Sequence, residues 1–297
     1  MTTQKTSLML RVSGRTDVGR VRQSNEDAYL LANLSTGERS SDPSMATWSV
    51  GDRGVIIAVS DGMGGAKAGE VASALSIEGL YEGLSAPEPE GSAGAEGKRD
   101  DAALLRGVIE QVSRKVRDAG QTADRRGMGA TLTAVLFRGP LAYVAEVGDS
   151  RAYLLRGGSI CQVTRDQSYV QLLVDAGLLT PEQAEESPQK NIILQVMGQK
   201  EDLRVEVGRI EVRQGDRFLL CSDGLSNSVP NEDILRISAA PASVDAACAE
   251  LVDAANRGGG DDNITVILAE VWGDLPAPTD AECEHSVETL QEFRRIR

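Results

Sequence analysis

Six acidic residues of this 297-residue chain stand where a short apolar segment meets a turn. They are Glu26 and Asp27 in NED, Asp61 in SDGMGG, Asp149 in GDSR, Asp223 in CSDGL and Asp262 in GGDDN. If the apolar segments are strands that share one end of a core, these carboxylates converge at that end. Converged carboxylates repel one another and persist only when they are protonated or neutralised by cations, so the pattern predicts a cation site.

The donor set of such a site contains oxygen alone, because neither histidine nor cysteine accompanies the acids as a ligand pair. Oxygen donors select hard ions such as Mg²⁺ or Mn²⁺. Two such ions about 3.5–4 Å apart generate a hydroxide at neutral pH and can hold a phosphoryl group during in-line displacement. Arg22, close before Glu26, would then supply paired donors to the phosphate oxygens.

Each acid taken alone has a simpler interpretation, as a turn former or a helix cap. Arg22 taken alone reads as a solvated surface charge. The joint pattern favours a shared site, because turn formation does not require an apolar strand to run into Asp on four separate occasions.

Composition argues against several other kinds of site. His285 is the single histidine and lies in a polar C-terminal stretch, so Ser-His-Asp hydrolases and His-ligated zinc enzymes lack their parts. The four cysteines include no CxxC pair, which predicts reduced thiols and neither a zinc site nor a disulfide framework. The net charge of -14 and the 3% of aromatic residues disfavour nucleic acid and anionic membranes as partners. We see no signal peptide or membrane-length apolar span, and we expect a cytoplasmic protein.

The elements that must position the acids follow from the apolar pattern. Residues 55–59 are a β-branched run of strand length that leads into Asp61, and residues 66–84 have the apolar spacing of a helix. Residues 127–164 alternate as three successive strands. Two runs of strands interleaved with two pairs of helices predict an α+β fold, a four-layer α/β/β/α sandwich in which helices flank two central antiparallel β-sheets.

Three stretches carry no clear strand pattern. Residues 33–53 contain turn formers and little periodicity, which predicts a surface excursion. Residues 85–99 are rich in Pro, Gly, Ala and Glu and predict an exposed loop. From Gly273 the chain is polar, with one short amphipathic helix expected around Val287, Leu290 and Phe293.

Six segments carry a resemblance to a known family. In chain order they are GRVRQSNEDAY, AVSDGMGG, GMGATLTAV, VGDSRAYLL, LLCSDGLS and GGDDNITVIL. Their order and approximate spacing resemble those of the metal-dependent PPM (type 2C) Ser/Thr protein phosphatases, most closely the bacterial branch. The similarity covers roughly residues 11–272. It implies hydrolysis of phosphoserine and phosphothreonine in proteins with Mn²⁺ or Mg²⁺, in opposition to a bacterial Ser/Thr kinase.

The resemblance also implies a role for each acid in holding two metal ions. Asp61 would bridge the two ions, and Asp223 and Asp262 would complete the first. Glu26 and the carbonyl group of Gly62, partly through water, would serve the second.

Further roles follow from the same resemblance. Asp27 matches the acid that orients metal-bound water, and Arg22 matches the phosphate-binding arginine. Asp149, with Asp223, resembles the site of a weaker third ion in bacterial members. Residues 165–203 correspond to the family's mobile flap beside the site.

The chain departs from the family pattern near the reaction centre. Eukaryotic relatives carry a histidine, proposed as the general acid, where Met63 stands, so a metal-bound water would have to protonate the leaving alkoxide. In the flap, Gln167 occupies a position that is often His, and SPQKN replaces a more basic HPRRN-like segment. Substrate preference is therefore the feature that the resemblance transfers least.

We expect a catalytic domain over residues 1–273, a polar tail over residues 274–297, and a monomer. Two other hypotheses stay open: a catalytically silent module that binds phosphoproteins on the same fold, and an acidic metal-binding protein without phosphate chemistry.

Overall fold

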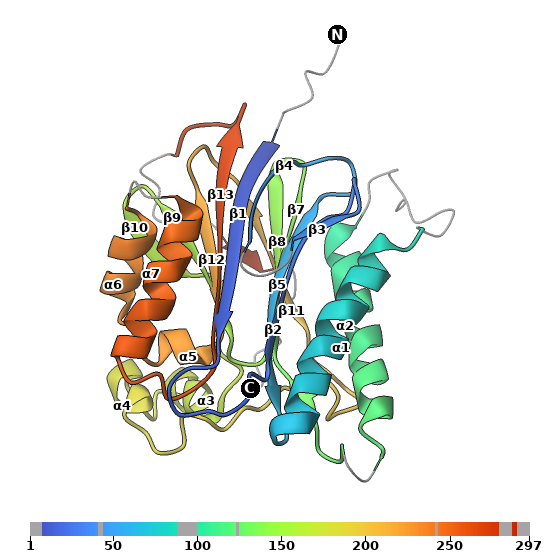
Figure 1. Ribbon diagram of the computed structural model, residues 1–297, viewed down its shortest axis with the longest axis vertical. Coiled ribbons are helices and arrows are strands. Elements are labelled where there is room, and N and C mark those ends of the chain that lie inside the picture. Colours follow the sequence, from blue (N-terminus) through green and yellow to red (C-terminus); the bar gives the residue numbers. More distant parts are fainter. Residues whose placement is uncertain are drawn as a thin grey trace.

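The structure is a computed structural model that describes residues 8–40, 44–87, 100–122, 125–240, 243–278 and 287–289. Two antiparallel β-sheets lie face to face, with helices on both outer sides (Figure 1). Sheet A consists, in spatial order, of β10 (Ser159–Gln162), β9 (Arg151–Arg156), β12 (Arg217–Cys221), β13 (Ile264–Gly273), β1 (Leu8–Asp17) and β4 (Ser44–Ser49). Sheet B consists of β14 (Val287–Thr289), β11 (Glu206–Glu211), β8 (Leu141–Val147), β7 (Leu132–Arg138), β5 (Val55–Met63), β2 (Asp27–Asn33) and β3 (Glu38–Ser40), and the short β6 (Gly129–Ala130) also pairs with β5.

Strand β5 shows why the central strands are continuously apolar. Ile57 and Val59 pack into the core between the two sheets, whereas Ile56 and Ala58 pack under the helices. Both faces of the strand are therefore buried, and each residue of the run loses apolar surface to one core or the other.

The helices cover the outer faces of both sheets. Helices α1 (Ala66–Ser85) and α2 (Asp101–Ala119) lie against sheet B, and α6 (Asn231–Ser238) and α7 (Val244–Arg257) lie against sheet A (Figure 1). The short α3 (Tyr169–Asp175), α4 (Pro181–Glu185) and α5 (Asp223–Ser226) gather at one end of the sandwich. The predicted four-layer sandwich is confirmed.

Residues 33–53 do not form the surface excursion that the sequence predicts. They supply β3 and also β4, which extends sheet A by pairing with β1. The guanidinium group of Arg53 donates to the carbonyl oxygens of Leu84 and Ala86 at 2.8 and 2.7 Å, so it satisfies backbone acceptors at the C-terminal end of α1. The stretch therefore closes one edge of sheet A and fixes a helix end.

The expectation of a helix around Val287 is wrong, because Val287–Thr289 forms β14 beside β11. Leu290, Phe293 and most of the predicted loop over 85–99 lie outside the described residues. Cys221 and Cys248 are buried free thiols, as expected, whereas Cys161 is disulfide-bonded and contradicts the prediction of reduced thiols. No helix in the described part of the chain is long and apolar enough to cross a bilayer.

Candidate metal centre

Asp61 and Asp27 face each other across two neighbouring strands. They are directly paired in the antiparallel register of β5 and β2. The backbone of Asp61 is fixed by Thr131, whose hydroxyl group accepts from the Asp61 N–H at 2.9 Å and whose own N–H donates to the Asp61 carbonyl at 2.8 Å. Strand pairing therefore places two acids distant in sequence at one end of sheet B.

Glu26 packs against the first turn of α1. Its carbonyl oxygen accepts from the N–H of Gly62 at 3.1 Å, and its own N–H donates to the side chain of Asn263 at 2.8 Å. A Cβ atom on Gly69 would lie 1.8 Å from the Glu26 Oε2 atom, and one on Gly62 would lie 2.1 Å from the Gly69 carbonyl oxygen. The glycines after Asp61 are thus required so that helix, strand and carboxylate can approach one another.

The carboxylate of Asp27 is held from sheet A. Its Oδ2 atom accepts from the hydroxyl groups of Ser222 at 2.7 Å and Thr265 at 2.6 Å. Its Oδ1 atom is buried and has no hydrogen-bond partner. A buried oxygen without a donor is available to a ligand.

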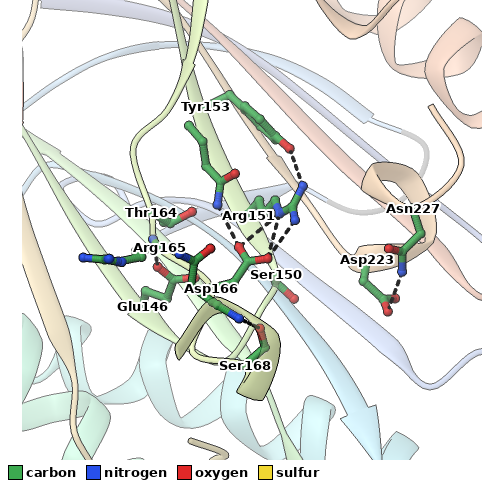
Figure 2. Close-up of polar contacts among 12 residues, drawn as sticks. Glu146, Ser150, Arg151, Tyr153, Thr164, Arg165, Asp166, Ser168, Asp223 and Asn227 are labelled. Atoms are coloured by element: carbon green, nitrogen blue, oxygen red, sulfur yellow. Dashed lines mark hydrogen bonds and ion pairs between the residues drawn. The ribbon is translucent and has the colours of Figure 1, made fainter. Parts of the chain in front are cut away.

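Asp223 follows the end of β12, and Asp262 lies just before the beginning of β13. Asp223 starts α5, and its Oδ2 atom accepts from the side chain of Asn227 at 3.0 Å, while its Oδ1 atom is buried without a partner (Figure 2). The Oδ2 atom of Asp262 accepts from Arg22 at 2.8 Å. This contact joins the β1–β2 loop to the start of β13 across 240 positions of the chain.

Asp149 lies in the turn between β8 and β9, where Gly148 has a φ of 112°. The next residue, Ser150, shares a hydroxyl hydrogen bond of 2.7 Å with Thr131, the residue that fixes Asp61. The turn that carries Asp149 is therefore bonded to the same threonine as the end of β5.

The electrostatics of the acids show that they share one neighbourhood. Burial raises the pKa of Asp61 well above its usual value, and the carboxylates of Asp27, Asp223, Asp149 and Asp262 raise it further. Burial is likewise the main reason that the pKa values of Asp27, Asp149 and Asp223 are raised. Carboxylates held so close are costly in their charged form unless cations neutralise them.

Arg22 and Glu26 belong to the same neighbourhood. Burial raises the pKa of Glu26, and the nearby Arg22 guanidinium opposes that shift. The hydrogen bond to Asp262 raises the pKa of Arg22, with smaller contributions from Glu26 and Asp61. The structure therefore brings together all seven charged residues that the sequence analysis singled out, with Gly62 beside them.

The chemistry of the donor set fits a site for hard cations. Among the residues that the structure describes, no three His, Cys, Asp or Glu side chains form a ready group around a single ion position. Two of the acids, Asp27 and Asp223, each present an unpartnered buried oxygen. Oxygen donors from Asp and Glu side chains suit Mg²⁺ or Mn²⁺.

Sequence reasoning missed the uncharged residues that support the acids. Asn263 accepts from the Glu26 N–H and donates to the carbonyl oxygens of Val18 and Ser24 at 3.0 and 2.9 Å. Ser222 and Thr265 supply the donors to Asp27. Asn263 directly follows Asp262 and Ser222 directly precedes Asp223, so adjacency to a predicted ligand was the available signal.

A cavity of about 640 Å³ adjoins the centre. Asp149 and Asp223 line it on the side of the centre. Residues 168–191, with α3 and α4, and residues 226–231 after α5 line it too, as do Arg151, Gln162 and Asp166. The cavity is large enough for a segment of a bound molecule to lie beside the acids.

Comparison with known proteins identifies the family. The family model described as Protein phosphatase 2C matches residues 32–265. The chain is 40% identical over 270 residues to the serine/threonine protein phosphatase PstP of Mycobacterium tuberculosis, and the aligned region covers 90% of this chain and 46% of PstP. It is 35% identical over 266 residues to protein phosphatase PhpP of Streptococcus pneumoniae, covering 88% of this chain and 98% of PhpP. This chain therefore spans about half the length of PstP.

Solved structures agree with this assignment. The catalytic domain of PstP, crystallised in complex with 2 manganese ions, is 36% identical with a TM-score of 0.70, and the match covers 89% of this chain and 99% of that domain. The serine/threonine phosphatase Stp1 of Staphylococcus aureus is 31% identical with a TM-score of 0.73, covering 87% and 94% of the two chains. The family resemblance in the sequence is confirmed, and the chain belongs to the protein phosphatase 2C family.

Proposed function

We propose that this chain is a metal-dependent phosphatase that hydrolyses phosphoserine and phosphothreonine in proteins with two Mn²⁺ or Mg²⁺ ions. Its relatives PstP and PhpP are named as protein phosphatases, and the PstP catalytic domain was crystallised with manganese. The observation that carries the proposal is the set of acids gathered around Asp61 at strand ends, with partnerless oxygens on the buried Asp27 and Asp223.

Asp61 would serve both ions, and the other acids would divide between them. Asp223 and Asp262 would hold the first ion, since both side chains lie at the adjacent ends of β12 and β13. Glu26 and the carbonyl group of Gly62 would hold the second, since a hydrogen bond of 3.1 Å keeps these two residues together. When bound, the ions supply an activated water and neutralise charge on the phosphate.

Arg22 and Asp27 have roles in binding phosphate and orienting water, and Met63 has no role in proton transfer. Arg22, whose side chain is 52% exposed, can turn its remaining donors to a phosphate while it stays bonded to Asp262. Asp27 is fixed by two hydroxyl groups and can orient a water molecule with its free Oδ1 atom. Met63 ends β5, but its thioether carries no proton, so it is not the general acid.

The finer expectations remain predictions. Asp149, with Asp223, is proposed to bind a third ion, since the Asp223 carboxylate is the strongest charged influence on the pKa of Asp149. A Ser/Thr kinase as the opposing enzyme, a cytoplasmic location and a monomeric state are carried over as part of the same proposal.

The decisive experiment is phosphate release from a phosphothreonine peptide with Mn²⁺, Mg²⁺ or EDTA. The unmodified protein should hydrolyse the peptide with either metal and lose activity in EDTA. Asp223→Asn should lower kcat/KM by more than the ~100-fold that loss of a residue supporting a metal ligand typically costs. Asp233→Asn, an exposed aspartate on α6, is the matched control and should retain activity. Full turnover by Asp223→Asn would refute the proposal.

The same assay separates the other two hypotheses. Metal-dependent binding of the peptide without phosphate release would favour a silent binding module. Arg22→Lys keeps the charge but removes the two-pronged donor arrangement, so KM should rise about tenfold with a smaller change in kcat. Arg236→Lys, on the exposed face of α6, is the control. An unchanged KM in Arg22→Lys would contradict the phosphate-binding role of Arg22. Metal binding with neither peptide binding nor phosphate release by the unmodified protein would favour a metal-binding protein without phosphate chemistry.

A further inference from the structure

The N-terminal end of the segment 165–203 is hydrogen-bonded to β8 and to the turn that carries Asp149. The N–H group of Arg165 donates to Glu146 at 2.7 Å. The backbone and side chain of Gln167 form a reciprocal pair with Gly148: the Gln167 N–H donates to the Gly148 carbonyl at 2.7 Å, and the Gly148 N–H donates to the Gln167 Oε1 atom at 2.9 Å. The residues on both sides of Asp166 in the chain are therefore held by hydrogen bonds to β8 and the turn that follows it.

Asp166, between them, forms an ion pair with Arg151. The Nε atom of Arg151 lies 3.0 and 3.1 Å from the two carboxylate oxygens, and a second guanidinium nitrogen lies 2.7 Å from Oδ2 (Figure 2). Gln162 donates to the same carboxylate at 2.7 Å, and Arg151 also donates to the hydroxyl group of the buried Tyr153 at 3.3 Å. The side chains of Arg151 and Asp166 are 23% and 13% exposed, so water screens this pair weakly.

The rest of the segment leaves and returns next to residue 166. The returning chain pairs with the outgoing chain just beyond the ion pair: the Leu194 N–H donates to the Gln167 carbonyl at 2.7 Å, and the Tyr169 N–H donates to the Ile192 carbonyl at 2.8 Å. Both ends of the part that carries α3 and α4 therefore meet at this point. That part lines the 640 Å³ cavity, and Arg151 and Asp166 line it as well.

We propose that the Arg151–Asp166 ion pair positions this part of the segment against the metal centre, so that a phosphoprotein chain in the cavity is aligned with Asp149 and Asp223. Arg151 and Asp166 are positioning residues for the polypeptide around the phosphorylated residue. The inference rests on the proposed phosphatase function. It distinguishes a phosphopeptide, which reaches this part of the segment, from a small aryl phosphate, which does not.

The test compares these two substrates on the full chain with Mn²⁺. For each protein, kcat/KM is measured for a phosphothreonine peptide long enough to fill the cavity and for p-nitrophenyl phosphate. In Asp166→Asn and Arg151→Lys, the ratio of the peptide value to the aryl phosphate value should fall roughly 3- to 30-fold. The double variant should lower the ratio no further than the stronger single variant, since both changes break one pair.

Glu270→Gln is the matched control. Glu270 forms a similarly buried ion pair with Arg217, with side chains 22% and 15% exposed, but Arg217 begins β12 at the end opposite Asp223. Its loss should destabilise the fold without changing the substrate ratio. This control separates positioning from a general loss of stability.

The possible failures are distinguishable. A ratio equal to that of the unmodified protein in an active Asp166→Asn or Arg151→Lys variant would overturn this inference and leave the proposed function intact. An equal fall of the ratio in Glu270→Gln would also overturn it, because the effect would then follow stability. Failure of the unmodified protein to hydrolyse either substrate would overturn the proposed function and the inference with it.

Discussion

Glu146 provides a sharp test of the electrostatics beside the candidate centre. It lies in β8, is 3% exposed, and is paired in register with Glu206 of β11. One carboxylate oxygen accepts from the Arg165 N–H, and the other is buried without a partner. Burial raises the pKa of Glu146 well above 4.5, and the carboxylate of Asp166 raises it further. We therefore expect Glu146→Gln to stabilise the protein in a pH-dependent way.

The sign follows from proton linkage. Between the unfolded-state pKa near 4.5 and the raised folded-state pKa, the folded protein holds a proton that the unfolded chain has released. Stability contributed by this residue is thus lost as pH rises through that window, by up to about 1.4 kcal/mol for each pH unit. Glu146→Gln removes this loss and keeps an oxygen that can accept from the Arg165 N–H.

The assay is urea unfolding of both proteins in EDTA at several pH values from 5 upward. The difference in free energy of unfolding should move in favour of Glu146→Gln by about 1 kcal/mol or more for each pH unit until the folded-state pKa is reached. Glu211→Gln, which removes an exposed carboxylate from the neighbouring β11, is the matched control. A pH-independent difference between Glu146→Gln and the unmodified protein would refute the reasoning.

Two further predictions concern residues that support the centre. Gly69→Ala should weaken activation by Mn²⁺ in metal titrations, because the new Cβ atom would displace Glu26. Gly107→Ala is the control: this glycine lies in α2 with open space around it, so the change should stabilise the protein by about 0.5–1 kcal/mol in urea unfolding. Equal behaviour of the two variants in both measurements would contradict the assignment. Thr265→Val keeps the shape of a buried side chain but removes one hydrogen-bond donor to Asp27. The free energy of unfolding, measured by urea titration, should therefore fall by about 1–3 kcal/mol. Unchanged stability would show that this hydrogen bond contributes nothing.

The fold was predictable wherever a segment is buried on both faces. The run at 55–59 is apolar throughout because sheet A covers one face and helices cover the other. Strands β4 and β14 escaped prediction, because each is a short strand whose pairing depends on a distant partner, β1 or β11, and not on its own pattern.

The candidate site was predictable to a similar depth. The proposed metal ligands stand out because an acid at the end of an apolar strand has few other reasons to recur. The hydroxyl groups that hold Asp27 do not stand out, because serine and threonine are common in strands and turns alike. Their role depends on contacts across 195 and 238 positions of the chain.

By itself, the sequence determined the two-sheet class of the fold, the identity of the acids and therefore the preference for hard divalent ions, since these depend on residue types and local periodicity. Only the tertiary structure decided which carboxylate oxygens are satisfied, how Arg22 meets Asp262, and how the 165–203 segment is bonded to the Asp149 turn. The physical reason is that hydrogen bonds and ion pairs act over about 3 Å, and such distances between remote residues exist only after the two sheets have packed.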